Sequence, residues 1–331
     1  MAQYIARRLL LMIPTLLAIS VISFLIIQLP PGDFLTSYLA TLAESGQVGG
    51  TTADALQALR AQYGLDQPVY VQYLKWLGRL LQGDFGYSME WKRPVWDLLW
   101  ERLALTFVLS LATLLFTWII AFPIGILSAV RQYSFWDYVA SFFGFLGLAT
   151  PDFLFALVLM WVAFAYFGQS VGGLFSPEFI EAPWSPAKVG DMVTHLWIPM
   201  LVLGTHGTAG LIRVMRANLL DELHKPYVET ARAKGLPEMR ALMKYPVRAA
   251  LNPFVSTVGW YLPGLVSGSV IVAVVLNLPI TGPLLLRALL SKDMYMAGSF
   301  IFMLSVLTVV GTLISDVLLA WLDPRIRFGE G

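Results

Sequence analysis

The stretch Leu9–Leu29, Leu-Leu-Leu-Met-Ile-Pro-Thr-Leu-Leu-Ala-Ile-Ser-Val-Ile-Ser-Phe-Leu-Ile-Ile-Gln-Leu, decides the class of fold. It follows Arg7 and Arg8 and is almost entirely apolar over the roughly 20 residues that a helix needs to cross a bilayer. A cleaved secretory signal normally has a core of about 7–15 apolar residues and a small-residue cleavage site. Here Pro-Pro-Gly-Asp follows at residues 30–33. We therefore expect a retained first transmembrane helix, with a cleaved signal as the alternative.

The composition of the whole chain also indicates a membrane protein. Of its 331 residues, 57% are hydrophobic and 13% are charged, and the mean hydropathy is +0.70. Soluble domains carry about 25% charged residues, so this chain has too little polar surface to cover a globule. The net charge of +1 argues against a nucleic-acid partner. The lack of cysteine excludes disulfides and cysteine-based metal or redox sites.

Five more apolar spans follow, near residues 103–130, 137–167, 195–216, 252–276 and 297–321. The predicted fold class is an all-α polytopic membrane protein with six transmembrane helices. If both termini are cytoplasmic, 13 Lys/Arg lie in cytoplasmic segments and three in the short outer loops. The positive-inside rule therefore favours the N-in/C-in topology.

This topology predicts four regions. Residues 1–29 form the cytoplasmic N-terminus and first transmembrane helix, and residues 30–102 form an extracytoplasmic segment with helices over 53–63 and 69–81. Residues 103–321 form a five-helix transmembrane core that contains a cytoplasmic loop at 213–250. Residues 322–331 form a cytoplasmic tail.

Several residues are candidates for a transport path or gate. Asp152, His206 and Asp316 are ionisable residues at predicted membrane depth, where such groups are often functional. A structural hydrogen bond or a position at a helix end is the alternative. Small residues recur at three-residue spacing (Gly204, Gly207, Gly210) and in the pattern Gly264-Leu-Val-Ser267-Gly268. These favour close helix packing; a moving surface along a pathway is the alternative.

The loop at 213–250 is unusually polar for a connector, with eight Lys/Arg and four Asp/Glu between Arg213 and Arg248. Its centre, Tyr227-Val-Glu-Thr-Ala-Arg-Ala-Lys-Gly235, predicts a helix with Glu229 and Arg232 at i,i+3 that ends at a glycine of positive φ. Pro237 suits the first turn of a second helix, with Leu236, Met239, Leu242 and Met243 on one face. Two short helices of this kind favour docking to a partner. An amphipathic helix lying in the lipid interface is the alternative.

This centre resembles the EAA loop of ATP-binding-cassette importer permeases of the dipeptide/oligopeptide type. The resemblance covers nearly the whole chain in the correct order: Tyr4-Ile-Ala-Arg-Arg-Leu9, Leu29-Pro-Pro-Gly-Asp33, Tyr63-Gly-Leu-Asp-Gln-Pro68, Gly83-Asp-Phe-Gly-Tyr-Ser88, His195-Leu-Trp-Ile-Pro199, Arg248-Ala-Ala-Leu-Asn252 and Leu322-Asp-Pro-Arg-Ile-Arg327. It implies one half of a solute pathway in a bacterial or archaeal cytoplasmic (inner) membrane. The implied partners are a second homologous permease, two ATPase subunits or domains and an extracytoplasmic solute-binding protein.

The resemblance also implies roles for individual residues. A coupling helix would be oriented by Glu229 and Arg232, kept small by Ala231 and Ala233 for close approach to the ATPase, and turned by Gly235; Tyr227 and Lys234 belong to the same contact. The loop would be braced by Arg213, Arg216 and Arg248. Since the sequence has no Gly-Lys pair and hence no phosphate-binding Walker A loop, ATP and Mg²⁺ are expected on the partner ATPase. This chain is expected to be no enzyme and to carry no cofactor or metal.

One stretch departs from the family pattern. Ala273 stands where a glutamate is common, and Leu276–Ile280, which includes Asn277, replaces an aromatic-Ser-Trp-Pro-Gly run. Both positions are path or gate candidates, with drift at a lipid-facing position as the alternative. The departure leaves open an oligosaccharide or related solute in place of a peptide.

Two other classes of protein are alternatives. An ion-coupled secondary transporter would usually carry internal repeats and a midplane carboxylate; no convincing repeat relates residues 1–165 to 166–331. An intramembrane serine protease would need a nucleophile such as Ser267 or Ser269 near His206. Serines in a packing face are the simpler interpretation.

Overall fold

The computed structural model describes residues 2–28, 66–168, 172–252, 254–255 and 270–322. Most of these residues are helical. The elements in chain order are α1 (Ala2–Gln28), α4 (Val69–Leu81), β1 (Tyr87–Ser88), β2 (Arg93–Pro94), α5 (Val95–Val130), α6 (Phe135–Ala149), α7 (Asp152–Phe167), the 3-10 turn η1 (Pro177–Phe179), α8 (Pro186–Leu223), α9 (Pro226–Ala233), α10 (Glu238–Lys244), α11 (Pro246–Ala250), α13 (Val270–Val275), α14 (Thr281–Leu290) and α15 (Met294–Leu322). β1 and β2 pair as a two-residue antiparallel ribbon, a small addition to the expected all-α fold.

Within the described residues, three helices are long and apolar enough to cross a membrane: α5, α8 and Met294–Leu319 of α15. They coincide with the spans expected near 103–130, 195–216 and 297–321. In α1, the described apolar stretch is Leu9–Leu25. The expected span 252–276 and the expected helix 53–63 lie largely or wholly outside the described residues. The predicted class, a helical protein that crosses the membrane several times, is therefore confirmed.

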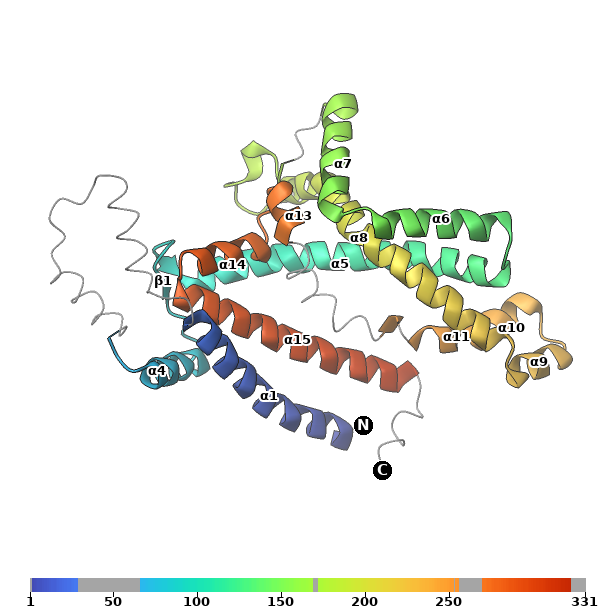
Figure 1. Cartoon of the computed structure of the whole chain (residues 1–331), viewed down its shortest axis with the longest axis horizontal. Helices are drawn as coiled ribbons and strands as arrows, with labels where there is room; N and C mark the ends of the chain where they lie inside the picture. Colours follow the sequence, from blue (N-terminus) through green and yellow to red (C-terminus); the bar gives the residue numbers. More distant parts are fainter. Residues whose placement is uncertain (1, 29–65, 169–171, 253, 256–269, 323–331) are drawn as a thin grey trace. The chain divides into compact units, whose positions relative to one another are not determined.

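The expected span 137–167 is broken in two, which corrects the prediction of one continuous helix. α6 and α7 meet at an angle of 103° (Figure 1), and the pair counts as a fourth span only if the two halves are taken together. Pro151 lacks a backbone N–H and disfavours helical geometry at the residue before it. Thr150 is accordingly extended (φ −85°, ψ 123°), and its hydroxyl donates to the carbonyl of Leu146 at 2.8 Å.

The chain forms two compact units. The first contains residues 105–279 and 308–331 with the first five residues, and the second contains residues 6–104 and 280–307. In the first unit, helices approach closely at glycines. A Cβ atom on Gly125 would lie 2.7 Å from Cβ of Met215, and one on Gly204 would lie 2.7 Å from the ring of Phe116. These contacts join α5 to α8, so the small-residue prediction holds as helix packing at Gly204.

The second unit is built around an aromatic cluster. Trp76 of α4 is 3% exposed and packs between Phe24 of α1 and Phe302 of α15, with ring centroids 5.7 and 6.2 Å away. Gly298 leaves room for the indole, because its Cβ position would lie 3.4 Å from that ring. A hydrogen bond of 2.8 Å joins Ser20 and Tyr73 beside the cluster. The predicted helix 69–81 is thereby confirmed, and its apolar face is buried against α1 and α15.

Candidate functional site

The centre of the polar loop is a pair of short helices joined by a tight turn. α9 ends at Ala233, and Gly235 has φ +78°, the positive value that the sequence predicts. The amide of Gly235 donates to the carbonyl of Arg232 (2.9 Å), and that of Leu236 donates to the carbonyl of Ala231 (3.3 Å). This pair of bonds is the Schellman arrangement, which satisfies the last carbonyls of a helix. α10 then begins at Glu238, one residue later than expected, with Pro237 preceding it.

The two helices are packed onto the membrane helices. Val228 and Ala231 of α9 and Ala241 and Leu242 of α10 are buried. Leu242 belongs to one apolar cluster with Phe254 and with residues of α5, α8 and α11, namely Ala121, Ala129, Leu211, Met215, Leu219, Val247 and Ala250. α10 is therefore joined through Leu242 to the apolar core that α5, α8 and α11 share.

The ion pair of the loop differs from the expected one. Arg232 hydrogen-bonds with Glu238 across the glycine turn, with Nη2 at 2.5 Å and Nε at 3.1 Å from Oε1, whereas the sequence suggested Glu229. The turn at Gly235 reverses the chain and brings the two side chains together. The guanidinium lowers the pKa of Glu238. The pair therefore stabilises the folded turn above the ordinary carboxyl pKa, and this contribution is lost as the pH falls through the lowered value.

The start of α9 is held by Glu222 of α8. Glu222 accepts hydrogen bonds from Nζ of Lys225 (2.6 Å) and from the Tyr227 hydroxyl. Burial, followed by the contact with Glu222, raises the pKa of the Tyr227 phenol, so this group stays a hydrogen-bond donor at neutral pH. The hydrogen bonds connect the end of α8 with α9 independently of the apolar packing.

The two helices present a mixed apolar and polar surface. The exposed side chains of this α9–α10 surface include Tyr227, Glu229, Ala233, Lys234, Met239 and Met243. Met239 and Met243 are 69% and 51% exposed. The expected apolar stripe is thus divided, because Leu242 points into the core while the two methionines face outwards. Flexible, polarisable methionines are suited to a protein-binding surface.

The two candidate alanines have different surroundings. Ala231 is 5% exposed and lies against the chain's own core, whereas Ala233 is exposed. The small size of Ala231 is therefore required by packing within the loop. Of the two, Ala233 alone is accessible to a partner, which corrects the expectation that both are kept small for close approach.

The three candidate bracing arginines also differ. Arg216 forms a two-pronged ion pair with Asp137 of α6, with Nε and Nη2 each 2.9 Å from a carboxylate oxygen. Arg213 stacks over the ring of Phe145 at 5.0 Å. Both arginines thus join α8 to α6. Arg248 is exposed on α11.

Asp137 was not recognised as important from the sequence. It is 3% exposed and also accepts hydrogen bonds from the Ser128 hydroxyl and from the Tyr133 amide (2.9 Å). The sequence does contain one local indication of Asp137: Ser134 lies three residues before it, which is the spacing of a capping box. In the structure Ser134 caps α6. The partner 79 residues away could not be identified from that local pattern.

The path candidates are only partly brought together. Asp152, at the start of α7, interacts electrostatically with His206 of α8. Ala273 is fully buried on α13, and Asn277 ends that helix with φ +49°. Its amide donates to the carbonyl of Val274 (3.1 Å), so Asn277 has a structural role as a cap. Gly264, Ser267 and Gly268, with Ser269, lie outside the described residues.

Comparison with known proteins assigns the family. The profile of the "Binding-protein-dependent transport system inner membrane component" family matches residues 121–328, and that of its N-terminal region matches residues 1–112. This chain belongs to that family. It is therefore a permease component of a membrane transport system.

Named relatives match over almost their full length. The chain is 40% identical to the oligopeptide transport system permease protein AppB of Bacillus subtilis over 329 residues, which is 99% of this chain and 100% of the relative. It is 31% identical to the oligopeptide permease OppB of Haemophilus influenzae, covering 99% of this chain and 100% of the relative. It is 32% identical to the glutathione permease GsiC of an Escherichia coli strain, again over 99% and 100%. The resemblance noted in the sequence is thus confirmed.

Proposed function

We propose that this permease forms half of the membrane pathway of an ATP-driven importer of peptides. The named relatives include oligopeptide and glutathione permeases, and these names support a peptide solute. In this proposal six transmembrane helices with N-in/C-in topology cross a bacterial inner membrane. A second permease completes the pathway, and an extracytoplasmic binding protein delivers the peptide.

The α9–α10 surface is the proposed contact for a separate ATPase. The observation that carries this assignment is the combination of exposed methionines outside and continuous apolar packing inside, from Leu242 to α8 and α5. A partner that binds Met239 and Met243 can therefore displace the membrane helices while α9 and α10 stay folded. The ATPase would supply ATP and Mg²⁺, and Tyr227, Glu229, Ala233 and Lys234 would surround the methionines.

The decisive experiment places one bulky residue on this surface. Ala233→Trp is expected to leave the permease in the membrane, to reduce its co-purification with the ATPase subunits and to abolish ATP-dependent peptide uptake in proteoliposomes. Ala217→Trp is the matched control, since Ala217 is an exposed alanine of α8 outside the α9–α10 surface. Equal uptake by the two variants would contradict the assignment of the contact. Uptake driven by an ion gradient without ATP would contradict the importer class.

A further inference from the structure

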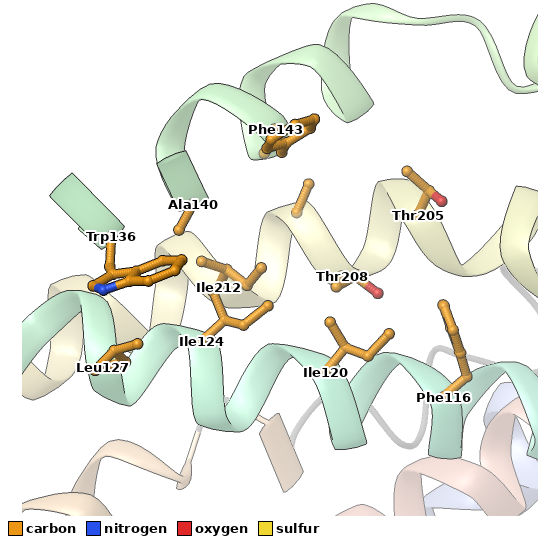
Figure 2. A pocket seen from close by; sticks show the side chains of 12 residues that line it. Phe116, Ile120, Ile124, Leu127, Trp136, Ala140, Phe143, Thr205, Thr208 and Ile212 are labelled. Atoms are coloured by element: carbon orange, nitrogen blue, oxygen red, sulfur yellow. The ribbon is translucent and has the colours of Figure 1, made fainter. Parts of the chain in front are cut away.

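An elongated cavity lies between α5, α6 and α8. Its volume is about 480 Å³, within the range of about 300–1,000 Å³ typical of small-molecule sites. In Figure 2 the side chains of Ile120 and Ile124 point from α5 towards α8. The other walls include Ala140 and Gly144 of α6 and Thr208 and Ile212 of α8. The lining is almost wholly apolar.

A gap in the packing at Gly144 keeps the cavity open. A Cβ atom on Gly144 would meet nothing within 4 Å, whereas one on Gly147, a turn later, would lie 2.9 Å from the side chain of Thr205. α6 therefore packs tightly on α8 at Gly147 and leaves space at Gly144. The empty space at Gly144 therefore results from the arrangement of the helices, and no side chain of the described residues fills it.

The cavity runs along the membrane helices. Its α5 wall is one stripe from Phe116 to Leu127, which is about 16 Å at 1.5 Å per residue. Both α5 and α8 are membrane-crossing candidates, so the long direction of the cavity follows the direction of lipid chains. A narrow apolar groove in this orientation fits a single acyl chain. A peptide, with its polar backbone, would leave hydrogen-bonding groups unsatisfied there.

One polar atom of the lining has no partner. The Oγ1 atom of Thr208 is buried and makes no hydrogen bond within the described part of the chain, although the residue is only 8% exposed. A helical threonine usually donates to the carbonyl four residues back. Here that carbonyl, of Gly204, accepts the hydroxyl of Thr117 at 3.4 Å. A buried donor of this kind is stabilised by an acceptor, and the ester carbonyl of a membrane glycerolipid supplies one.

A cation follows the cavity lining along α8, one helical turn beyond Ile212, the last α8 residue of that lining. Arg216 follows Ile212 by one helical turn on the same face of α8 and is 28% exposed. The Nε and Nη2 atoms of Arg216 donate hydrogen bonds to Asp137. Among the described residues, the Nη1 atom of Arg216 has no hydrogen-bond partner. Long side chains of a helix lean towards its N-terminus, and this direction brings the guanidinium back towards Thr208. Trp136, next to Asp137, lines the cavity, as expected for an interfacial aromatic residue.

We propose that this cavity binds one acyl chain of a membrane glycerophospholipid, with its ester carbonyl on the Thr208 hydroxyl and its phosphate towards Arg216. The bound chain fills the space at Gly144 and packs between α6 and α8. It thereby becomes part of the contact between the two helices that the Arg216–Asp137 ion pair also joins. The site does not depend on which solute the transporter carries.

Photolabelling of the intact transporter tests the site. The complex is reconstituted in vesicles of phosphatidylethanolamine and phosphatidylglycerol that contain a trace of phosphatidylglycerol with a diazirine on its acyl chain, and labelled peptides are identified by mass spectrometry. Labelling is expected to concentrate on the peptides that carry Ile120, Ile124 and Phe143. Unlabelled phosphatidylglycerol should compete better than diacylglycerol, because only the former carries a phosphate. Even labelling over all lipid-facing helices, or equal competition, would overturn the proposal.

Two variants and a matched control make the test specific. Gly144→Leu fills the cavity from a position with open space and should reduce the labelling several-fold; Gly210→Leu, also with open space but outside the lining, should not. Thr208→Val removes the hydroxyl at nearly constant volume and should weaken competition by phosphatidylglycerol about five-fold, the value of one hydrogen bond. Equal labelling in Gly144→Leu and Gly210→Leu would refute the site.

Labelling of the isolated permease that disappears in the whole complex would also refute it, because a partner helix would then occupy the cavity. Labelling needs no transport, so failure here leaves the proposed function untouched.

Discussion

At the scale of single residues, the decisive feature of the loop is the backbone at Gly235. Its φ of +78° lies in the left-handed region, which residues with a Cβ atom adopt only at a cost. A Cβ atom at this position would meet no neighbour within 4 Å. The demand for glycine therefore comes from the backbone alone, and it can be measured without steric interference.

We predict that Gly235→Ala destabilises the turn between α9 and α10 by about 1 kcal/mol. The expected signature is faster hydrogen exchange at the amides of Gly235 and Leu236, which close the turn. Gly210→Ala is the control, because Gly210 is helical and its Cβ position is also free; that change should be neutral or stabilising. Unchanged exchange in Gly235→Ala would show that the turn is not held as described.

At the scale of elements, buried carboxylates fasten segments that lie far apart in the chain. Asp137 joins α6 to α8 in the first unit. In the second unit, Asp293 is fully buried between α14 and α15 and accepts hydrogen bonds from the Ser88 hydroxyl (2.6 Å), the Glu90 amide (3.1 Å) and the Met296 amide (3.1 Å). It therefore caps α15 and holds the ribbon of β1 and β2 at the same time.

We predict that Arg216→Gln lowers the free energy of unfolding by about 2–3 kcal/mol, because it leaves the buried Asp137 carboxylate without its cation. This value is below the roughly 3–5 kcal/mol of a fully buried pair, since Arg216 is 28% exposed. The free energy of unfolding of Arg216→Lys should lie between those of the unchanged protein and of Arg216→Gln, because lysine keeps the charge but cannot form the two-pronged contact. Thermal unfolding in detergent measures these differences. The double variant Asp137→Asn/Arg216→Gln should recover part of the loss, and strictly additive losses would contradict the pairing.

A second prediction at this scale concerns Asp293. Asp293→Ala leaves the Ser88 hydroxyl and two backbone amides without their acceptor, and each buried unsatisfied group costs about 1–3 kcal/mol. We expect a loss on the order of 3 kcal/mol, together with faster proteolysis within residues 83–94. In a double-mutant cycle, Ser88→Ala should add little once Asp293 has been removed. Independent effects of the two changes would exclude the hydrogen bond as the link.

At the scale of the whole molecule, the absence of cysteine permits a direct test of the six-span topology. Single cysteines can be introduced at Lys234 and at Glu181, two exposed positions that the N-in/C-in topology assigns to opposite sides of the membrane. We predict that a membrane-impermeant maleimide labels Glu181→Cys in intact cells, and labels Lys234→Cys only after the membrane is opened. The two positions serve as controls for each other. Labelling of both in intact cells would place them on the same side of the membrane, with an even number of spans between them, and would contradict the topology, which puts one span between them.

The sequence by itself determined the membrane class, the family, the approximate positions of three long helices and the positive φ at Gly235. These follow from hydropathy, ordered motifs and local backbone preference, all of which are encoded within a few neighbouring residues. The tertiary structure decided which alanine is accessible, that Arg232 pairs with Glu238, and that α6 and α7 part at Pro151. It also revealed Asp137, Asp293 and the cavity beside Thr208. Asp137 and Asp293 bind residues 79 and 205 positions away, and the cavity is the space left where helices diverge, so no local pattern carries that information. The Arg232–Glu238 pair spans only six residues, but it forms only because the turn at Gly235 reverses the chain.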